Sequence, residues 1–597
     1  MNEPAPKDYN PISSIQGTGA ASPLAGERAS TRGIVTGDFQ DGDANTQNNL
    51  GGFFLQSLAP DQDNRTSEGL FVFDRNAKGT DVGVGDIVTV SGSVEERFGE
   101  TQLKADAVAI IGKGNATATE LRLPAAGTVH NSDGTVVADL EHLEGMFLQV
   151  PQRLFVQDLA GLERYGEILL STEERQFQFT EREQPDAAGY RKHRQRVAAQ
   201  VLMLDDGRVV QNASPVRYIG DSGSAGRAPR LSDAAESLQG VLRYSRGSGP
   251  NGLETWRLMP TSAPRFVVRN PRPEPPAIDA PIIVASFNLL NYFSTIDSGK
   301  NRCGPALDQG CRGAESAREF KRQRQRTANA IEQSGASIVG VMELENNARA
   351  SVEDLTAALA ATGGEWRFID TGTIGDDVIR VGIVYRPDRV SPFGDHAILD
   401  ASVDKRFDDN RNRPALAQTF RSVDNGGKFT VAVNHLKSKG SPCDDDGDPN
   451  RGDGQGNCNQ TRTQAALALA DWLESDPTSS GDSDILIVGD LNAYSEEDPV
   501  RALREAGFRD LLRTRTGSET WSFAFRGESG ALDHALASPA LAAQVSEVVE
   551  WHINADESAL YDYNLNFGRD PGLFDPDAVW RASDHDPLLV GLKLQPD

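Results

Sequence analysis

Residues able to bind metal or phosphate recur at the ends of short apolar runs in the C-terminal half of this 597-residue chain. The runs are continuous rather than alternating, which is typical of strands buried on both faces. Loops at one rim of a buried sheet hold functional side chains on a rigid scaffold, so we expect these polar residues to gather there. The polar residues at or beside the predicted strand ends are Asn288, Glu343, Asn434, His435, Asp490, Asn492, Asp533, Asp584 and His585.

Carboxylates, amides and imidazoles at six separate strand ends are hard to explain as core chemistry and indicate a functional site. A single acid after a strand is more often a turn or helix-cap residue, so the interpretation depends on the whole set. His534 and Asp586 alternate away from Asp533 and His585, and we expect both to have structural roles.

The elements that position these residues are predicted to alternate between strand and helix from about residue 282 onward. Amphipathic patterns predict helices over 315–334, 351–362, 460–474 and 497–506. Short apolar strands between such helices favour an α/β fold whose sheets are covered by helices.

The order and spacing of the motifs resemble the endonuclease/exonuclease/phosphatase (DNase I-like) superfamily. The resemblance covers residues 282–597 and implies a four-layer α/β sandwich with two central sheets. The β-rich N-terminal region and the paired cysteines further resemble secreted bacterial nucleases that carry N-terminal OB-like modules. The motifs that carry the resemblance are N-x-L at 288–290, VME at 341–343, NHLKSK at 434–439, GDLNA at 489–493, LDH at 532–534 and SDHDP at 583–587.

The resemblance implies a site for Mg²⁺ or Mn²⁺. Glu343 is the expected principal ligand, with the neutral oxygen of Asn288 beside it and Asp584 completing the cluster. Hard oxygen ligands from one or two carboxylates, together with water molecules, suit Mg²⁺. Taken alone, Glu343 would be read as a solvated acid at a strand end.

The resemblance also implies roles in catalysis. Asp490 is the expected base or water-orienting group, with Asn492 holding the nucleophile or the phosphate. His435 and His585 are expected to contact the scissile phosphate as imidazolium ions. Asp533 is expected to pair with His585, which fixes the tautomer of its ring and raises its pKa.

Before residue 268 the sequence is predicted to be mostly β, because β-rich runs are separated by Gly, Asp and Asn. The whole fold class is therefore multidomain, with all-β modules before the α/β sandwich. We expect a flexible tail over 1–10, an OB-like β domain over 11–125 and a second β-rich domain over 126–267. Short sequence similarities to the first module make the second domain a candidate OB-like copy. A Pro-rich linker over 268–281 then leads to the catalytic domain over 282–597.

Four basic residues are candidates for contact with substrate phosphate: Lys437, Lys439, Arg380 and Arg413. A run of alternating arginines over 322–326 lies on a predicted helix. Those arginines are interpreted either as a solvated face or as phosphate contacts.

The four cysteines fall into two close pairs, Cys303 with Cys311 and Cys443 with Cys458. Local pairing predicts two disulfides and hence an oxidising compartment, while free thiols or a four-cysteine zinc site are the alternatives. The second pair flanks an acidic loop whose alternating oxygen donors predict a structural Ca²⁺ site, although the Glu that closes an EF-hand loop is missing. The alternative is a solvated acidic hairpin. The candidate ligands are Asp444, Asp446, Asp448, Asn450 and Asp453.

The net charge of −27 argues against a protein that merely coats nucleic acid, because such binding depends on Lys and Arg neutralising phosphates. It argues less against an enzyme whose metal ions supply local positive charge. No apolar run is long enough to cross a membrane. The N-terminus has no signal-peptide pattern, as expected either of a processed secreted chain or of a protein that was never exported.

Together these features predict a secreted or cell-surface bacterial nuclease, monomeric and dependent on a divalent metal, that acts on extracellular DNA or RNA and leaves 5′-phosphate ends. A lipid or small-molecule phosphodiesterase of the same fold is the first alternative. Its membrane contact would be sought at Tyr561, Tyr563, Leu565 and Phe567, which form no clear apolar hairpin. A non-catalytic surface protein that binds nucleic acid is the second alternative.

Overall fold

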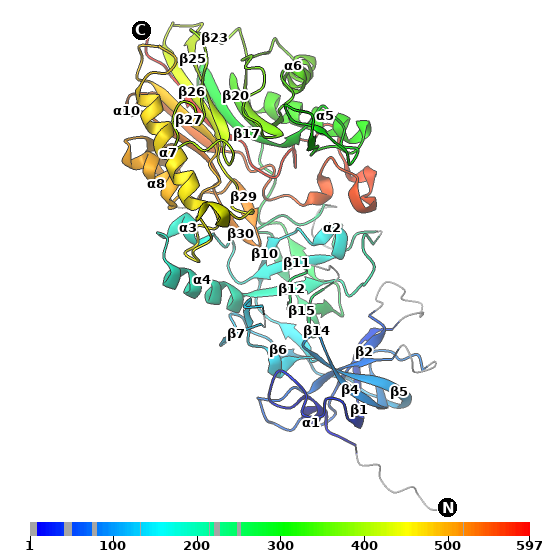
Figure 1. Ribbon diagram of the computed structural model, residues 1–597. Coiled ribbons are helices and arrows are strands. Elements are labelled where there is room, and N and C mark those ends of the chain that lie inside the picture. The colour runs from blue at the N-terminus through cyan, green and yellow to red at the C-terminus, as the bar shows by residue number, and fades with distance from the viewer. Residues whose placement is uncertain are drawn as a thin grey trace, which may run out of the picture. The chain divides into compact units, whose positions relative to one another are not determined.

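The computed structural model describes residues 9–40, 50–74, 80–131, 133–213, 215–219, 227–247, 252–517 and 519–596. Most of the tail expected over 1–10 lies outside these ranges. The chain divides into two compact units, and Figure 1 shows the elements of each. The first unit comprises residues 1–176 and 194–270, and the second comprises 177–193 and 271–597. No helix in the described ranges is long and apolar enough to span a membrane.

The first unit begins with a closed five-stranded barrel in the order β1-β2-β3-β5-β4. Burial alternates along β4, as expected of a strand with one face toward the barrel interior. Phe53, Leu70 and Val88 fill that interior, and Ile12 and Ile15 of the short helix α1 (Ile12–Gln16) pack with them. The barrel strands are β1 (Arg28–Phe39), β2 (Gly52–Gln56), β3 (Gly69–Phe73), β4 (Asp86–Arg97) and β5 (Glu100–Lys113).

The rest of the first unit is built on an open nine-stranded sheet in the order β16-β13-β10-β11-β12-β15-β14-β9-β6. A small hairpin of β7 (Thr128–His130) and β8 (Val136–Ala138) precedes most of it. The strands of the sheet are β6 (Thr119–Glu120), β9 (Phe147–Val150), β10 (Leu154–Asp158), β11 (Glu167–Ser171), β12 (Val201–Asp205), β13 (Ala234–Glu236), β14 (Leu238–Ser245), β15 (Thr255–Pro260) and β16 (Arg265–Val267).

The second unit contains a six-stranded sheet in the order β21-β22-β20-β17-β33-β32 and a seven-stranded sheet that includes β23-β25-β26-β27-β31-β28, with β24 paired to β25. The first sheet consists of β17 (Ile282–Tyr292), β20 (Ile338–Glu345), β21 (Arg367–Phe368), β22 (Ile379–Tyr385), β32 (Val545–Glu550) and β33 (Leu588–Leu592). The second consists of β23 (Val390–Pro392), β24 (Ala397–Leu399), β25 (Arg413–Ser422), β26 (Lys428–His435), β27 (Ile485–Asp490), β28 (Arg509–Asp510) and β31 (Asp533–Ala537).

The two sheets of this unit share one hydrophobic core, to which Val284 and Ile338 contribute from one sheet and Val431 and Val488 from the other. The opposite face of the six-stranded sheet is covered by α5 (Ala317–Gln333) and α6 (Ala350–Thr362). The opposite face of the seven-stranded sheet is covered by α7 (Asn459–Glu474) and α8 (Asp498–Glu505). Both faces of the central strands are therefore buried, which explains why their sequences are continuously apolar.

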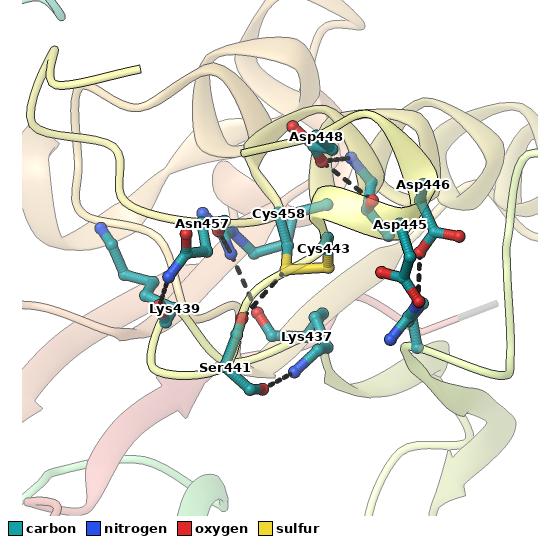
Figure 2. The surroundings of a disulfide bond; sticks show 12 residues. Lys437, Lys439, Ser441, Cys443, Asp445, Asp446, Asp448, Asn457 and Cys458 are labelled. Carbon is teal, nitrogen blue, oxygen red and sulfur yellow. Dashed lines mark hydrogen bonds and ion pairs between the residues drawn. A yellow bond between two sulfur atoms is a disulfide. The ribbon is translucent and has the colours of Figure 1, made fainter. Parts of the chain in front are cut away.

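Both predicted cysteine pairs lie at disulfide distance. The Cα atoms of Cys303 and Cys311 are 5.1 Å apart, and those of Cys443 and Cys458 are 5.4 Å apart. Figure 2 shows the second pair between the start of α7 and the loop that follows β26. The four cysteines are thus paired with each other, and no zinc site is formed from them.

One segment was not anticipated from the sequence. Residues 177–193 belong to the second unit, although they follow β11 and precede β12 of the first unit. They contain α3 (Phe179–Arg182) and the first part of α4 (Ala187–Gln200).

Candidate active site

Three neighbouring strands of the seven-stranded sheet carry polar residues in one row. His435 at the end of β26 pairs with Asp490 at the end of β27, and Asp490 pairs with Asp533 at the start of β31. Arg413 on β25 pairs with His435 and extends the row by one strand. Residues paired directly across a sheet lie within about 5.5 Å of each other, so the register alone gathers these groups.

Asn288 and Glu343 come from the six-stranded sheet, on β17 and β20. The pairing of these strands is interrupted between Asn288 and Tyr292, and the pairing of β20 with β22 is interrupted between Val341 and Leu344. At this irregularity Glu343 has a φ of 60°, in the left-handed region that costs about 1–3 kcal/mol for a residue other than glycine. The bulge redirects the Glu343 side chain out of the regular alternation of the strand.

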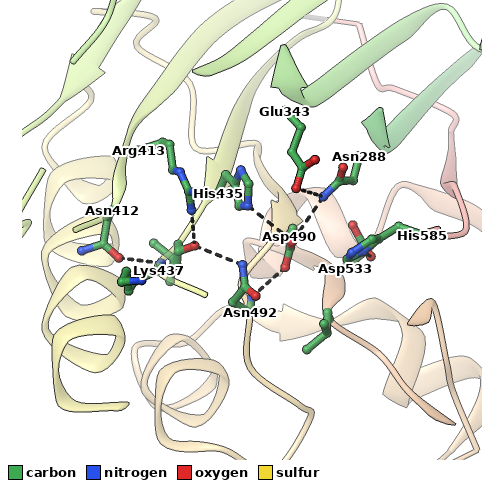
Figure 3. A network of polar contacts seen from close by, with 12 residues as sticks. Asn288, Glu343, Asn412, Arg413, His435, Lys437, Asp490, Asn492, Asp533 and His585 are labelled. Carbon is green, nitrogen blue, oxygen red and sulfur yellow. Dashed lines mark hydrogen bonds and ion pairs between the residues drawn. The ribbon is translucent and has the colours of Figure 1, made fainter. Parts of the chain in front are cut away.

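The two sheets meet through the amide of Asn288. Its Nδ2 atom donates to Glu343 Oε1 at 3.3 Å and to Asp490 Oδ2 at 3.4 Å, as Figure 3 shows. The Asn288 oxygen accepts from the backbone N–H of Leu290 at 3.1 Å. The backbone N–H of Asn291 donates to the other oxygen of Glu343 at 2.9 Å. One buried amide therefore joins the two carboxylates expected to carry the metal and the base.

Asp490 lies at the centre of the cluster and is 2% exposed. The backbone N–H of Asn492 donates to Asp490 Oδ1 at 2.8 Å, and the Asn492 side chain donates to the Leu436 carbonyl at 3.1 Å. Burial raises the pKa of Asp490 to about 7, with the His585 cation opposing the rise and Asp533 adding to it. A carboxyl group with a pKa near neutrality is suited to accepting a proton from water.

The two histidines differ in the direction of their pKa shifts. Burial alone would lower the pKa of His585, but the adjacent Asp533 outweighs it, and Asp490 and Asp584 add to the effect, so the pKa is held well above its ordinary value. Burial lowers the pKa of His435 well below its ordinary value, and the cations Arg413 and His585 lower it further. These shifts favour the neutral form of His435, in contrast to the expectation that both rings are imidazolium ions.

His585 is held by neighbours on several sides. Its Nδ1 lies 2.7 Å from Asp533 Oδ2, which also accepts from the Ser522 hydroxyl at 2.7 Å. The Phe523 ring stacks on the His585 ring with centroids 4.6 Å apart. Ser522 and Phe523 were not selected from the sequence, because a serine and a phenylalanine at the start of a short strand carry no distinctive signal.

The donor set fits a divalent cation. Burial raises the pKa of Glu343, and repulsion from Asp584 raises it further. A cation held between these two carboxylates would relieve both costs, and carboxylate oxygens are ligands that Mg²⁺ prefers. Asn288 would offer its oxygen after half a turn of its amide. Among the described residues no group of three or more His, Cys, Asp or Glu side chains is arranged to hold a metal.

Asp586 and His534 lie beside the cluster but face other partners. Asp586 accepts from the backbone N–H of Asn554 at 2.7 Å and lies 3.0 Å from His552 Nδ1. The ring of His534 bonds to the Ala493 carbonyl at 2.8 Å. These bonds hold the loops that flank the site.

The four basic candidates are placed differently. Arg413 is next to the cluster, where it bonds to Asp377 at 3.0 Å and to the Leu436 carbonyl at 3.1 Å. Lys437 is half-buried and bonds to the Ser441 hydroxyl. Arg380 is 1% exposed and donates to Thr371 and to the Ala348 carbonyl, so it is buried away from solvent and is not available to phosphate.

Lys439 also departs from the expectation. Its ammonium group bonds to the buried carboxylate of Glu497 and lies 4.2 Å from the centre of the Tyr494 ring. Burial lowers the pKa of Lys439 to about 8, although Glu497 opposes the shift. The lysine is therefore committed to an internal ion pair instead of to the substrate.

The predicted calcium ligands do not converge. Asp448 accepts from the backbone N–H of Thr461 at 2.8 Å and from that of Gln460 at 3.2 Å, both in the first turn of α7.

The other candidate ligands have local partners. Asp446 pairs with Arg411 at 2.6 Å (Figure 2). Asn450 and Asp453 accept from backbone N–H groups two residues ahead in their own turns. The carbonyl of Asp444 accepts from the backbone N–H of Gly447 at 3.1 Å. The acidic loop is thus stabilised by its own turns and a helix terminus, and a structural Ca²⁺ in this loop stays a prediction.

Two arginines of the run over 322–326 on α5 are buried instead of forming a solvated face. Arg322 and Arg326 are buried, and both guanidinium groups lie about 4 Å from the centre of the Phe574 ring. Arg326 also donates to the carbonyls of Tyr561 and Asp575. These arginines fix the irregular chain between β32 and β33. Within that chain Tyr563 is buried and Phe567 is 53% exposed.

Comparisons with known proteins were made once this geometry was established. A model of the endonuclease/exonuclease/phosphatase family matches residues 285–585. Similar solved structures include a family protein from Bacteroides thetaiotaomicron, with 17% identity, covering 52% of this chain and 96% of that chain at a TM-score of 0.33. The catalytic domain of human Nocturnin with bound sulfate has 15% identity and covers 53% of this chain and 96% of that chain, with a TM-score of 0.32.

A further solved structure, D. rerio TDP2 complexed with a single-strand DNA product, has 15% identity and covers 52% of this chain and 97% of that chain, with a TM-score of 0.33. No curated protein matches the sequence. The family match, which spans half of the chain, is the finding on which membership rests.

Proposed function

Because the chain belongs to the endonuclease/exonuclease/phosphatase family of hydrolases, we propose that it is a nuclease that requires a divalent metal. Its substrate is the phosphodiester backbone of extracellular DNA, with RNA as a second substrate, and its products carry 5′-phosphate ends. The observation that carries the proposal is the Asn288 amide, which joins the Glu343 carboxylate to the Asp490 carboxylate across two sheets.

Glu343, Asn288 and Asp584 would hold Mg²⁺ or Mn²⁺. When bound, such an ion neutralises phosphate charge and polarises the phosphoryl oxygen. Asp490 accepts a proton from the attacking water, and Asn492 supports Asp490 through its backbone N–H. The neutral His435 and the cationic His585 donate hydrogen bonds to phosphate oxygens, and Asp533 holds the His585 charge in place.

The N-terminal unit is proposed to guide the substrate. The first unit contains a closed five-stranded barrel in which β3 pairs with β5 in parallel. This topology supports an OB-like module, and such barrels commonly bind single-stranded nucleic acid. The layering of two sheets between helices supports the four-layer sandwich. Two paired disulfides support a secreted or cell-surface location, because such bonds persist in oxidising compartments.

The test is degradation of plasmid DNA by the wild-type protein with Mg²⁺ or Mn²⁺, with and without EDTA. We expect cleavage that EDTA abolishes and that His435→Ala reduces strongly. Structured RNA and a phosphodiester lipid are assayed in parallel. Cleavage of the lipid alone would replace the nuclease proposal with a lipid phosphodiesterase, and binding of DNA without cleavage would leave a non-catalytic protein.

A further inference from the structure

The segment of residues 177–193 contacts three loops that surround the candidate active site. At one end Gln178 donates its backbone N–H to the Ser529 carbonyl at 2.9 Å, next to a bridge between Phe177 and Ser529. At the other end His193 bonds to Glu528. Both partners lie in the hairpin of β29 (Phe523–Phe525) and β30 (Glu528–Gly530), which also supplies Phe523 to the His585 ring.

Glu181 is the most buried carboxylate of this segment, with no exposed surface. One of its oxygens accepts from the hydroxyls of Ser495 at 2.6 Å and Thr520 at 2.9 Å. The other accepts from the backbone N–H of Ala531 at 3.0 Å and of Ser495 at 3.4 Å. A single side chain thus receives four hydrogen bonds from three separate segments of the catalytic unit.

Those loops carry the catalytic residues. Ser495 follows Asn492 in the loop that leaves β27, and Ala531 comes just before Asp533 at the start of β31. Thr520 comes just before Ser522, whose hydroxyl donates to Asp533 at 2.7 Å. The carboxylate of Glu181 therefore fixes the distance between the loop after Asp490 and the loop before Asp533, two residues that pair across β27 and β31.

The neighbouring residue Thr180 extends the same contacts. Its carbonyl accepts from the backbone N–H of Glu496 at 2.8 Å, and its hydroxyl donates to Glu497 at 2.7 Å. Glu497 also accepts from Lys439, which follows His435 along the chain. The Thr180 hydroxyl lies 3.4 Å from the Gly454 carbonyl within the Cys443–Cys458 loop.

Gly530 and Tyr494 pack closely beside Glu181. A Cβ atom built on Gly530 would lie 2.6 Å from the Tyr494 ring and 3.3 Å from Glu181 Oε2. Buried polar atoms held by several hydrogen bonds rigidify their surroundings when every partner is satisfied. Both carboxylate oxygens of Glu181 are fully satisfied in this way, since each accepts two hydrogen bonds.

From this arrangement we propose that Glu181, a residue from between two strands of the N-terminal unit, is a positioning residue for the nuclease site. It holds the loops that carry Asn492 and Asp533 at the spacing that phosphodiester hydrolysis requires. The expected change in kcat rests on the proposed function. The ordering of the two loops by Glu181 does not depend on it. It makes the catalytic unit dependent on a segment outside the residues matched by the family model.

Three variants of the full-length protein test this. Glu181→Ala removes all four acceptor bonds. Glu181→Gln keeps the shape and can satisfy every partner, because its oxygen accepts the two N–H groups while the hydroxyls of Ser495 and Thr520 turn to accept from its amide. Glu183→Ala is the matched control, since Glu183 lies in the same segment and is exposed. Thr520→Val, which removes one bond, serves if Glu181→Ala does not fold.

We expect Glu181→Ala to lower kcat by about tenfold to a hundredfold, as a small misplacement of catalytic groups does, with KM changed less than about twofold. Glu181→Gln restores kcat to near the wild-type value, and Glu183→Ala does not alter it. Thr520→Val gives a smaller loss in the same direction.

Hydrogen–deuterium exchange followed by mass spectrometry tests positioning without reference to activity. Glu181→Ala should speed exchange by about tenfold in peptides covering 493–497 and 519–533, and leave peptides from β17 and β20 unchanged. Unchanged exchange in those two loops, or equal kcat for Glu181→Ala and wild type, would overturn the proposal. A wild-type protein that cleaves no nucleic acid would refute the proposed function alone, because the exchange result stands independently.

Discussion

The ring of His585 is bonded to Asp533 at 2.7 Å, whereas the ring of His435 lies 3.5 Å from Asp490 and has an unpartnered Nδ1 among the described residues. Asp533 outweighs burial at His585 and raises its pKa, whereas burial lowers the pKa of His435. The charged form is therefore favoured at His585 and the neutral form at His435, so the two rings would be distinct donors to a phosphate.

Asp490→Asn tests the base at the residue scale. The amide cannot accept the proton of water, so kcat on plasmid DNA should fall by about a hundredfold to ten-thousandfold. Asp395→Asn, at an exposed acid of the same unit, is the control and should keep wild-type kcat. Initial rates under saturating Mg²⁺ measure both, and an active Asp490→Asn protein would remove Asp490 from the role of base.

Asp533→Asn tests the origin of the His585 charge. Removing the carboxylate removes the largest effect that raises the His585 pKa and leaves burial, which lowers it. The pKa of His585 should therefore fall, and the pH above which activity declines should move downward. Activity measured from pH 5 to pH 10 shows the shift, and an unmoved upper limb would contradict the assignment.

At the scale of elements, irregular backbone gathers the site. Glu343 and Asn492 have φ values of 60° and 47°, and Gly489 has a φ of 136° directly before Asp490. A Cβ atom on Gly489 would lie 2.0 Å from the carbonyl oxygen of Asn434 in the adjacent strand. Only glycine allows β26 and β27 to approach this closely where His435 and Asp490 pair.

Gly489→Ala should therefore destabilise the second unit by about 2 kcal/mol or more and abolish activity. Gly440→Ala is the matched control, because a Cβ there meets nothing within 4 Å, and its effect should stay within about 0.5 kcal/mol. Urea unfolding of both variants provides the comparison. Equal stability of Gly489→Ala and wild type would show that the strands can separate without cost.

The elements themselves were largely predictable. The helices expected over 315–334 and 460–474 are observed as α5 and α7 with ends shifted by at most a few residues, because apolar periodicity reports burial directly. The register that aligns His435, Asp490 and Asp533 was not predictable, since it depends on pairing between strands far apart in sequence. The local sequence pattern also did not reveal the partners of Lys439 and Asp448, because those partners, Glu497 and Thr461, lie in other elements.

At the scale of the whole molecule, the net charge is −27, although the proposed substrate is a polyanion. Within the cluster the positive charges of His585 and Arg413 face the carboxylates of Asp490 and Glu343, so the site has no large excess of cationic side chains. A bound divalent ion would supply the missing positive charge at the point of reaction. The account therefore depends most strongly on the metal and on the carboxylate that holds it.

The most direct test of that claim is the Mg²⁺ dependence of cleavage of a labelled DNA oligonucleotide by wild type and Glu343→Gln. The account predicts that wild type cleaves only when Mg²⁺ is present and leaves 5′-phosphate ends. It predicts that Glu343→Gln, folded as judged by its unfolding midpoint, loses at least about a hundredfold in rate at the same Mg²⁺ concentration. Cleavage that survives EDTA, or a Glu343→Gln protein with wild-type rate and metal dependence, would contradict it.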